Sequence, residues 1–454
     1  MERWAFGSRW WAQIEQRLAW RAGRSSHARL TVVSQFFPPD FAATGQLLDD
    51  LTGHLAARGL QVQLLSGQPA YAYRTSRAPA LEFQPNRCIR RSRASRLWPR
   101  RIRGRAVNGV LFCLRSSLRL LRSARRGDLL LFTSEPPQLT LFGWALTRLT
   151  RTPYLLLLYD LYPDVLVGLG ALPAQHPLVR LWRRFNRHLL ADAAEVIVLS
   201  EAMAGRVLRA AGKPGAAGNP GAAGNPGGSD LQGRLHVIPS WADPEQIQPL
   251  AKHANPFVAA HQLEDLFTVL YSGNQGRCHD LMTVMAAALL LRAEEGIRFL
   301  FIGAGAQNER LRDLVHEWAL PNCSFLPYQD RDTLPFSLAA GTPVAAISPA
   351  GAELGQLVQS SGCGRWFANG DAAALASWIL ALQADPATCR RHGQAARSLL
   401  LDTASPDRVM EAYAQLITAH LPAAPTFQVL PLPSGVLQPI PFRAAKPRRR
   451  ITAA

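Results

Sequence analysis

Two segments in the second half of the chain each read as a buried strand that turns through glycines into a helix. In the first, the turn at 272–277 follows a strand that begins at Phe267. In the second, the turn at 303–305 follows a strand that begins at Arg298. Such turns present backbone N–H groups and the positive end of a helix dipole, which together hold phosphate. The pattern predicts a nucleotide or nucleotide-sugar site, with Arg277 placed to neutralise a diphosphate.

The rest of the chain repeats this alternation of strands and helices. Strand-like runs occur at 30–34, 62–65, 129–132, 154–158 and 196–199, with helical segments between most of them. Alternating elements of this kind favour open parallel sheets with helices on both faces. With 454 residues, the chain is long enough for two such domains. The predicted fold class is therefore α/β, with two Rossmann-like domains that face a cleft.

Changes in composition give the expected domain boundaries. The hexapeptide Gly-Ala-Ala-Gly-Asn-Pro at 215–220 repeats at 221–226, which indicates a flexible insertion. The N-terminal extension spaces its tryptophans helically, so an interfacial helix, a loose tail and a start assigned too far upstream all stay open. The expected segments are a basic, Trp-rich extension at 1–28, an N-terminal domain at 29–212, the insertion at 213–234, a C-terminal domain at 235–405, a C-terminal helix at 406–421, and a disordered, Pro-rich basic tail at 422–454.

The formal net charge of +18 comes mainly from arginine. No acidic residue interrupts the arginine-rich stretch from Arg87 to Arg126. Two interpretations stay open, a solvated basic face and a surface for anionic lipid head groups. Nucleic acid is set aside as a partner because no recognised nucleic-acid-binding module accompanies the charge. The six scattered cysteines and the lack of a long apolar run are typical of a cytoplasmic protein.

Several of these segments together resemble a known family. The chain is similar to the family 4 glycosyltransferases of the GT-B fold, and within them to the colanic-acid type of exopolysaccharide glycosyltransferase. The matching segments are 35–40 with 43–46, 133–137, 159–164, 237–243, 271–280 and 301–305.

This resemblance implies a retaining, metal-independent transfer of a sugar from a nucleotide diphosphate sugar. The donor would bind the C-terminal domain, and a saccharide or polyprenyl-diphosphate-linked acceptor would bind the N-terminal one. No cofactor is implied beyond the donor substrate. Exopolysaccharide biosynthesis would place the enzyme in the cytoplasm, peripheral at the inner face of the cell membrane. The Asp330-Arg331-Asp332 segment is interpreted as a loop and not as a metal-binding D-x-D.

The resemblance also assigns roles to individual residues. Asp160 would contact hydroxyl groups of the acceptor or the sugar, with a turn or N-cap aspartate as the alternative. Arg277 would contact the diphosphate, with a surface arginine at a helix start as the alternative. Gly45 would let the first-domain loop approach the donor closely. The donor-binding residues are expected to be Gly45, Gly273, Asn274, Arg277, Gly303 and Gly305.

The segment near residue 340 departs from the family pattern. Family members carry a glutamate-bearing segment beyond the second glycine turn, whereas here no glutamate occurs between Glu317 and Glu353. We expect an internal deletion that removes one strand–helix unit from the C-terminal domain. Glu353 is then a possible substitute carboxylate. The alternative function is a catalytically impaired relative that binds nucleotide sugar or a partner without turnover. A non-transferase enzyme of the same fold, such as a sugar-nucleotide epimerase, is a third interpretation.

Overall fold

The computed structural model describes residues 28–40, 42–69, 78–93, 102–123, 127–212, 231–338 and 341–421, together with Trp20, and gives only the backbone at 102, 103, 105 and 331. These residues belong to one compact unit, Met1–Pro422, whereas a second unit, Ala423–Ala454, lies outside them. The expected tail at 422–454 therefore lies outside the described residues. So do most of the extension at 1–28 and of the insertion at 213–234.

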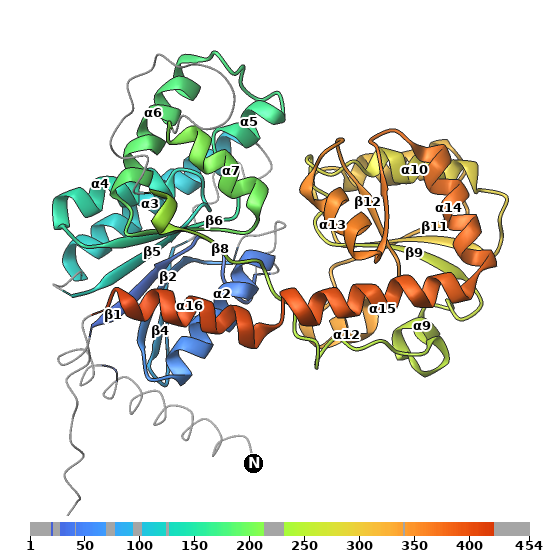
Figure 1. The fold of residues 1–454 in the computed structure, drawn as a ribbon, viewed down its shortest axis with the longest axis horizontal. Coiled ribbons are helices and arrows are strands. Elements are labelled where there is room, and N and C mark those ends of the chain that lie inside the picture. The colour runs from blue at the N-terminus through green and yellow to red at the C-terminus, as the bar shows by residue number, and fades with distance from the viewer. Residues whose placement is uncertain are drawn as a thin grey trace, which may run out of the picture. The chain divides into compact units, whose positions relative to one another are not determined.

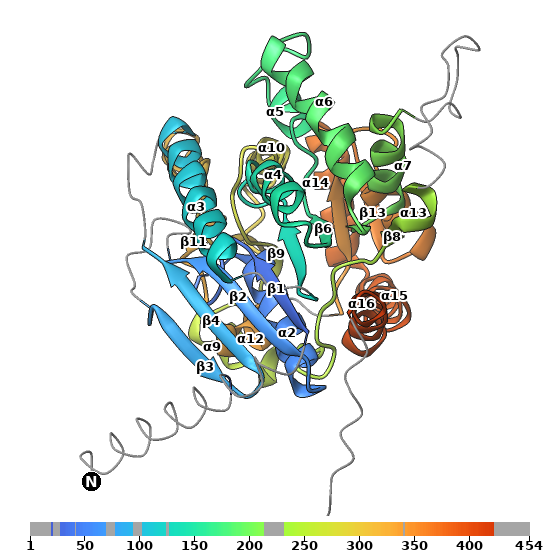
Figure 2. The ribbon, with the colours of Figure 1, turned by 90° about the vertical axis from the view of Figure 1, so that its left-hand side faces the viewer.

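An eight-stranded sheet forms the first half of the fold, in the order β3-β4-β2-β1-β5-β6-β7-β8 (Figures 1 and 2). Only β3 runs antiparallel to its neighbour. Strands β1, β5, β6 and β7 at its centre read as near-continuous apolar runs, as expected when helices cover both faces of a sheet. Its strands are β1 (Arg29–Val33), β2 (Gln61–Gly67), β3 (Leu81–Gln84), β4 (Arg87–Ser92), β5 (Leu129–Thr133), β6 (Tyr154–Leu158), β7 (Glu195–Val198) and β8 (Leu235–Val237).

Alternate strand residues point into two separate cores. Leu155 and Leu157 of β6 join the core beneath α2, whereas Leu156 and Leu158 join the core beneath α3, α4, α6 and α7. This division follows from the two-residue period of a strand. The helices of this half are α2 (Ala43–Ala57), α3 (Ile102–Ser123), α4 (Leu139–Thr150), α5 (Asp164–Gly168), α6 (Pro177–Asp192) and α7 (Glu201–Ala210), with a 3-10 turn η2 (Gln232–Arg234).

The second half of the fold contains two smaller parallel sheets, β11-β10-β9 and β12-β13. Its strands are β9 (Phe267–Ser272), β10 (Ile297–Ile302), β11 (Cys323–Leu326), β12 (Val344–Ile347) and β13 (Gly364–Phe367). Its helical elements are η3 (Lys252–Ala254), α9 (Pro256–Ala260), α10 (Leu281–Leu290), α11 (Asn308–Glu317), η4 (Arg331–Thr333), α12 (Leu334–Ser337), α13 (Glu353–Ser361), α14 (Ala372–Ala384) and α15 (Pro386–Thr403).

The first strand of each half has a different environment. In the first sheet β1 lies between β2 and β5 and is fully buried. In the second half β9 pairs only with β10 among the described strands, and none of its residues is buried. On β12 the Val344 side chain is 37% exposed. The position on the open side of β9, which a strand occupies in the first sheet, has no strand within the described residues.

The last helix, α16 (Pro406–Ala419), returns to the first sheet. Met410, Tyr413 and Ile417 lie in the same core as Leu51 of α2. The Tyr413 ring meets the Trp241 ring edge-on, with centroids 5.9 Å apart. The C-terminal helix expected at 406–421 is therefore present and completes the core beneath α2.

The structure moves one expected boundary. The sequence suggested that the second domain begins at residue 235, but β8 starts there and pairs in parallel with β7 of the first sheet. Leu231 is buried in the first half, so the insertion ends before it and not at residue 234. The three residues of β8 form no sequence pattern that indicates which sheet the strand joins. The path of the chain through the fold decides which strand β8 pairs with.

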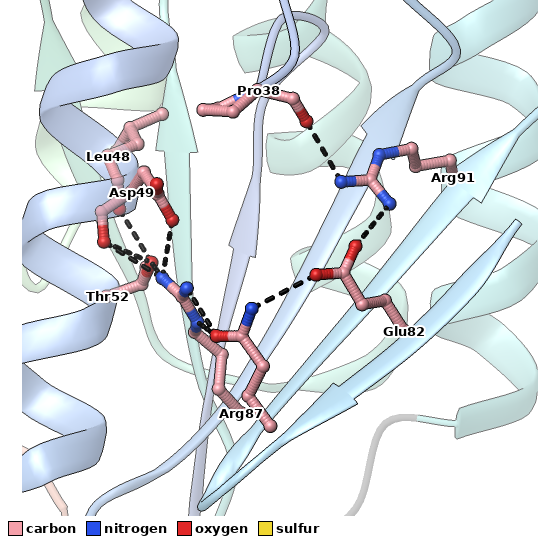
Figure 3. A network of polar contacts seen from close by, with 8 residues as sticks. Pro38, Leu48, Asp49, Thr52, Glu82, Arg87 and Arg91 are labelled. Atoms are coloured by element: carbon pink, nitrogen blue, oxygen red, sulfur yellow. Dashed lines mark hydrogen bonds and ion pairs between the residues drawn. The ribbon is translucent and has the colours of Figure 1, made fainter. Parts of the chain in front are cut away.

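Two arginines of the basic stretch are internal (Figure 3). The Arg87 guanidinium pairs with the Asp49 carboxylate at 2.7 Å and donates to the Thr52 hydroxyl. Arg91 pairs with Glu82 at 3.0 Å and donates to the carbonyl oxygen of Pro38 at 2.9 Å. These arginines fasten β4 to α2 and to the loop after β1, so they do not belong to an open basic surface.

The open edge of β9 yields a hydrogen-exchange prediction. Phe267 and Gly273 donate their N–H groups towards β10, so by alternation the Leu270 N–H points to the open side. We expect it to exchange at least about tenfold faster than the N–H groups of Val269 and Tyr271, because it has no ladder partner among the described strands. Residue-resolved hydrogen–deuterium exchange measures this. Equal protection of all three amides would show that something covers the edge.

Candidate functional site

Three side chains gather at the carboxyl end of the first sheet. Thr44 lies in the first turn of α2, Glu135 follows β5, and Asp160 follows β6. The Thr44 hydroxyl donates to Glu135 Oε2 at 2.8 Å. Loops at the carboxyl ends of parallel strands meet at one edge, which is where open α/β sheets bind ligands. Asp160 was predicted for this site, whereas Thr44 and Glu135 were not.

The Ser134 hydroxyl fixes the backbone that carries Asp160. It accepts hydrogen bonds from the N–H groups of Tyr159 and Asp160, both at 3.0 Å. The Asp160 carboxylate itself is half-buried, and no hydrogen-bond partner of it is found among the described residues. Its position suits a role in accepting a hydrogen bond from a ligand.

Burial shifts the acid–base behaviour of both carboxyl groups. Burial raises the pKa of Glu135, the Thr44 hydrogen bond opposes that rise, and the nearby Asp160 carboxylate adds to it. Burial also raises the pKa of Asp160. Two carboxylates that share one site disfavour each other's ionised form. The pair therefore holds a proton to higher pH than either group would in water.

A pocket adjoins Asp160. Trp182 and Asn186 of α6 and Arg206 of α7 line it with Tyr162. The Tyr162 and Trp182 rings stack with centroids 6.2 Å apart, and Asn186 Nδ2 donates to the Tyr162 carbonyl at 2.6 Å. Amide, carboxylate and guanidinium groups around apolar walls give a pocket that can orient a polar ligand.

The two glycine turns of the second half pack directly on each other. A Cβ at Gly303 would lie 2.1 Å from the Gly273 carbonyl oxygen, and one at Gly305 would lie 2.4 Å from the Gln275 carbonyl oxygen. Gln275 is fully buried between the turns, with its N–H donating to the Ala304 carbonyl at 2.9 Å. Gly303 and Gly305 thus make room for the first turn. From the sequence, these two glycines were predicted to make room for a nucleotide.

Gly45 shows the same kind of close packing within the first half. Its Cβ would meet Phe37 Cα at 3.0 Å and the Phe36 carbonyl oxygen at 3.1 Å. The glycine therefore lets α2 lie against the loop after β1. Gly273 differs from these three, because a Cβ there would meet no atom within 4 Å. Of the predicted glycines, Gly273 leaves open space for a ligand.

Fewer backbone N–H groups are open at these turns than the sequence suggested. The N–H of Gly276 donates to the Asn274 carbonyl at 2.8 Å. Asp280 caps α10, because its carboxylate accepts the Thr283 N–H at 3.2 Å and the Thr283 hydroxyl at 2.6 Å. A carboxylate thus already occupies the helix end that was expected to meet phosphate. Binding of an anion here would depend mainly on the exposed side chains.

Asn274 and Arg277 are among those exposed side chains. No ion pair of the Arg277 guanidinium is found among the described residues. Burial and, after it, the Asp160 carboxylate raise the pKa of the neighbouring Cys278 thiol. The Cys278 thiol, next to Arg277, is thus within the electrostatic influence of Asp160.

Glu353 lies elsewhere. Its two carboxylate oxygens accept the N–H groups of Glu201 and Ala202, at 3.1 Å and 3.0 Å, at the start of α7. These contacts use the side chain at a helix N-terminus, where a negative charge is stabilised. In this arrangement the carboxylate expected as a substitute is bound to protein. The Asp330–Asp332 segment, expected to be a loop, has its last two residues in the short 3-10 turn η4, and no group of side chains suited to a metal ion is found within the described residues.

Sequence comparisons point to glycosyl transfer. Residues 44–217 match the glycosyl transferase 4-like domain family. The probable glycosyltransferase WbjE of Pseudomonas aeruginosa is 24% identical over 387 residues, which cover 78% of this chain and 88% of WbjE. The putative colanic acid biosynthesis glycosyl transferase WcaI of Escherichia coli is 32% identical over 117 residues, which cover 25% of this chain and 28% of WcaI. These matches support a glycosyltransferase.

Solved structures confirm the fold class. Sucrose-phosphate synthase from Thermosynechococcus elongatus superposes with a TM-score of 0.67 at 20% identity, covering 86% of this chain and 100% of that one. Anabaena HepE in complex with UDP-glucose superposes with a TM-score of 0.59 at 13% identity, covering 87% and 100%. WaaG, a glycosyltransferase involved in lipopolysaccharide biosynthesis, superposes with a TM-score of 0.59. The fold is therefore GT-B.

The packing of the two turns predicts that a methyl group at Gly303 strongly destabilises the folded protein. Gly303→Ala should lower the free energy of unfolding by about 2–5 kcal/mol, because the Cβ meets backbone and φ is +125°. Gly273→Ala is the matched control, since its φ of +149° brings strain without a clash. Urea denaturation compares the two. Equal losses would mean that the turns are not in contact.

The raised pKa of the half-buried Glu135 carboxyl group predicts a pH-dependent effect. A raised pKa means that Glu135 favours folding at low pH and that this contribution is lost as pH rises through the folded pKa. Glu135→Gln should therefore gain stability relative to the natural chain as pH rises from about 4 to about 8, by about 1 kcal/mol or more. Urea midpoints across this range measure the difference.

The control is Glu317→Gln, which changes an exposed carboxylate on α11. Its stability difference should stay within about 0.5 kcal/mol at every pH. A Glu135→Gln difference that is equally flat would contradict the assignment of a half-buried, proton-retaining Glu135.

Proposed function

We propose that this chain is a retaining, metal-independent glycosyltransferase that moves a sugar from a nucleotide diphosphate sugar to a polysaccharide or a polyprenyl-diphosphate-linked acceptor in exopolysaccharide biosynthesis. The observation that carries the proposal is the group formed by Thr44, Glu135 and Asp160 at the carboxyl end of the first sheet, the edge at which open α/β sheets bind ligands. The matches to glycosyltransferases and the UDP-glucose held by HepE support the class of donor.

The chemistry divides between the two turns and the first sheet. A bond forms between an acceptor hydroxyl oxygen and the sugar's anomeric carbon, the bond from that carbon to the diphosphate breaks, and the hydroxyl proton leaves with the diphosphate. Arg277 would stabilise the charge that grows on the leaving diphosphate. Asp160 would accept a hydrogen bond from the acceptor or sugar hydroxyl. Gly273 would let the donor approach the backbone, because no atom lies in the space beside it.

Arg277 carries the direct test of donor binding. Arg277→Ala should weaken binding of a UDP- or GDP-sugar by about 1.5–3 kcal/mol, the range for a hydrogen bond to a charged group. Arg292→Ala is the matched control, since it removes an exposed arginine beyond α10 of the same half. Isothermal titration calorimetry against a panel of nucleotide sugars measures both. Unchanged affinity in Arg277→Ala would remove this residue from the site.

The divided second sheet favours a second candidate function, a relative that binds nucleotide sugar without turnover. β9 and β12 both lack a partner on one side within the described residues, as expected if a strand–helix unit near residue 340 is absent. Residues 339–340, where the expected deletion falls, lie outside the described residues. Glu353, the substitute carboxylate, is bound to α7. Calorimetric binding together with no transfer of labelled sugar would favour this candidate, and transfer would favour the first.

A further inference from the structure

Helix α3 carries two strips of side chains that point away from the sheet. The exposed apolar residues of this helix share one face and are Val107, Leu114, Leu118 and Leu121. Leu118 is 53% exposed, although Phe112 and Leu120 of the same helix are buried. Each of the three leucines is followed directly by an exposed arginine, at Arg115, Arg119 and Arg122. The helix contains no acidic residue.

Helix α6 repeats the arrangement. Its exposed apolar residues are Leu178, Leu181 and Phe185. Spacings of three and four residues place them on one side of the helix. A neighbouring strip of arginines has the same spacing and consists of Arg180, Arg184 and Arg187. The inner side of α6, with Val179 and Leu190, packs on the sheet.

Helix α4 lies between the other two and joins them into one layer (Figure 2). It exposes Leu149 by 73%, and its Trp144 ring lies 5.9 Å from the Phe185 ring of α6. The nearby carboxylates are neutralised, because Asp192 pairs with Arg148 at 2.8 Å and Asp164 pairs with Arg183 at 2.7 Å. The outer side of α3, α4 and α6, here called the outer layer, is thus both apolar and cationic.

We propose that the outer layer docks on the surface of an anionic phospholipid bilayer. Arginines at its surface would meet lipid phosphates, and the leucine strips would enter the boundary between head groups and acyl chains. A nucleic acid would use the arginines but would leave the leucines exposed to water. The interpretation of the basic stretch as a lipid surface thus keeps the part of the stretch on α3, excludes Arg87 and Arg91, which are buried, and extends to α6.

The two sides of α6 connect this surface to the pocket beside Asp160. Trp182 and Asn186 line the pocket, while Leu181 and Phe185 lie in the outer layer. A lipid-linked acceptor would reach the pocket from the same surface that holds the protein. This last step rests on the proposed function, whereas docking itself requires no nucleotide and no turnover.

Co-sedimentation of the full chain with vesicles tests the proposal. The probes are vesicles of phosphatidylcholine alone and vesicles that also contain phosphatidylglycerol, without nucleotide. One variant combines Leu118→Ser with Phe185→Ser, and another combines Arg119→Gln with Arg184→Gln. Each should lower binding to the anionic vesicles about tenfold or more, because each removes two groups that meet the bilayer.

Matched controls change the same residue types in the second half. Leu354→Ser with Leu357→Ser alters two exposed leucines of α13, and Arg390→Gln with Arg391→Gln alters two exposed arginines of α15. These should leave vesicle binding within about twofold of the natural chain. Since all these side chains are exposed, the variants should fold, which circular dichroism checks.

Several results would overturn the proposal. They are the absence of binding to anionic vesicles, equal losses in variants and controls, and binding that survives both outer-layer variants. Retention on duplex DNA as strong as on vesicles, with no effect of the leucine and phenylalanine changes, would identify a general polyanion surface instead. Because the assay contains no donor or acceptor, a failure of glycosyl transfer leaves its outcome unaffected.

Discussion

Parallel strands impose one constraint on this molecule from which the rest follows. All strands of a parallel sheet end at the same edge, so the loops that follow them must share a small space. In the first sheet that space holds Thr44, Glu135 and Asp160, from three segments far apart in sequence. In the second half it holds the two glycine turns, which contact each other through their backbones.

The sequence predicted the alternation of elements well because apolar runs and glycine turns are local signals. Arg277 and Asp160 were predicted as site residues from the turns and motifs that carry them, because those segments are also local signals. The roles of Gly303 and Gly305 could not be predicted in the same way. A glycine needed for a ligand and a glycine needed for another turn look identical in sequence, and the buried Gln275 decides between them here.

Other features depend on contacts that a linear pattern does not contain. Arg87 and Arg91 read as part of a basic surface, yet their partners Asp49 and Glu82 lie on a helix and a strand that fold against β4. Glu135 stands in a motif that the sequence did identify, but its burial and its hydrogen bond to Thr44 arise from α2. In the sequence alone, the exposed leucines of α3 cannot be told from core residues. The fold distinguishes them, because the sheet packs on the opposite side of that helix.

The divided second sheet is held by its helices. Ala346, Val358 and Cys363 form a small core of their own, packed against α15, whereas β9 and β10 belong to a larger core with α10, α11 and α14. Trp366 Nε1 donates to the Ser348 carbonyl at 3.1 Å, which ties the β12–β13 pair together beyond its ladder. A two-stranded sheet is marginal by itself. The β12–β13 pair therefore depends on α13 and α15 for its stability.

The return of α16 to the first sheet has a consequence for synthesis on the ribosome. Tyr413 and Ile417 fill the core beneath α2, yet they are translated after nearly all of the chain. Until that helix emerges, the face of the first sheet that it covers stays open to water, even though every strand of the sheet has already been made. The domain that begins first is thus among the last to be completed, and its nascent form exposes an apolar surface of the kind that chaperones bind.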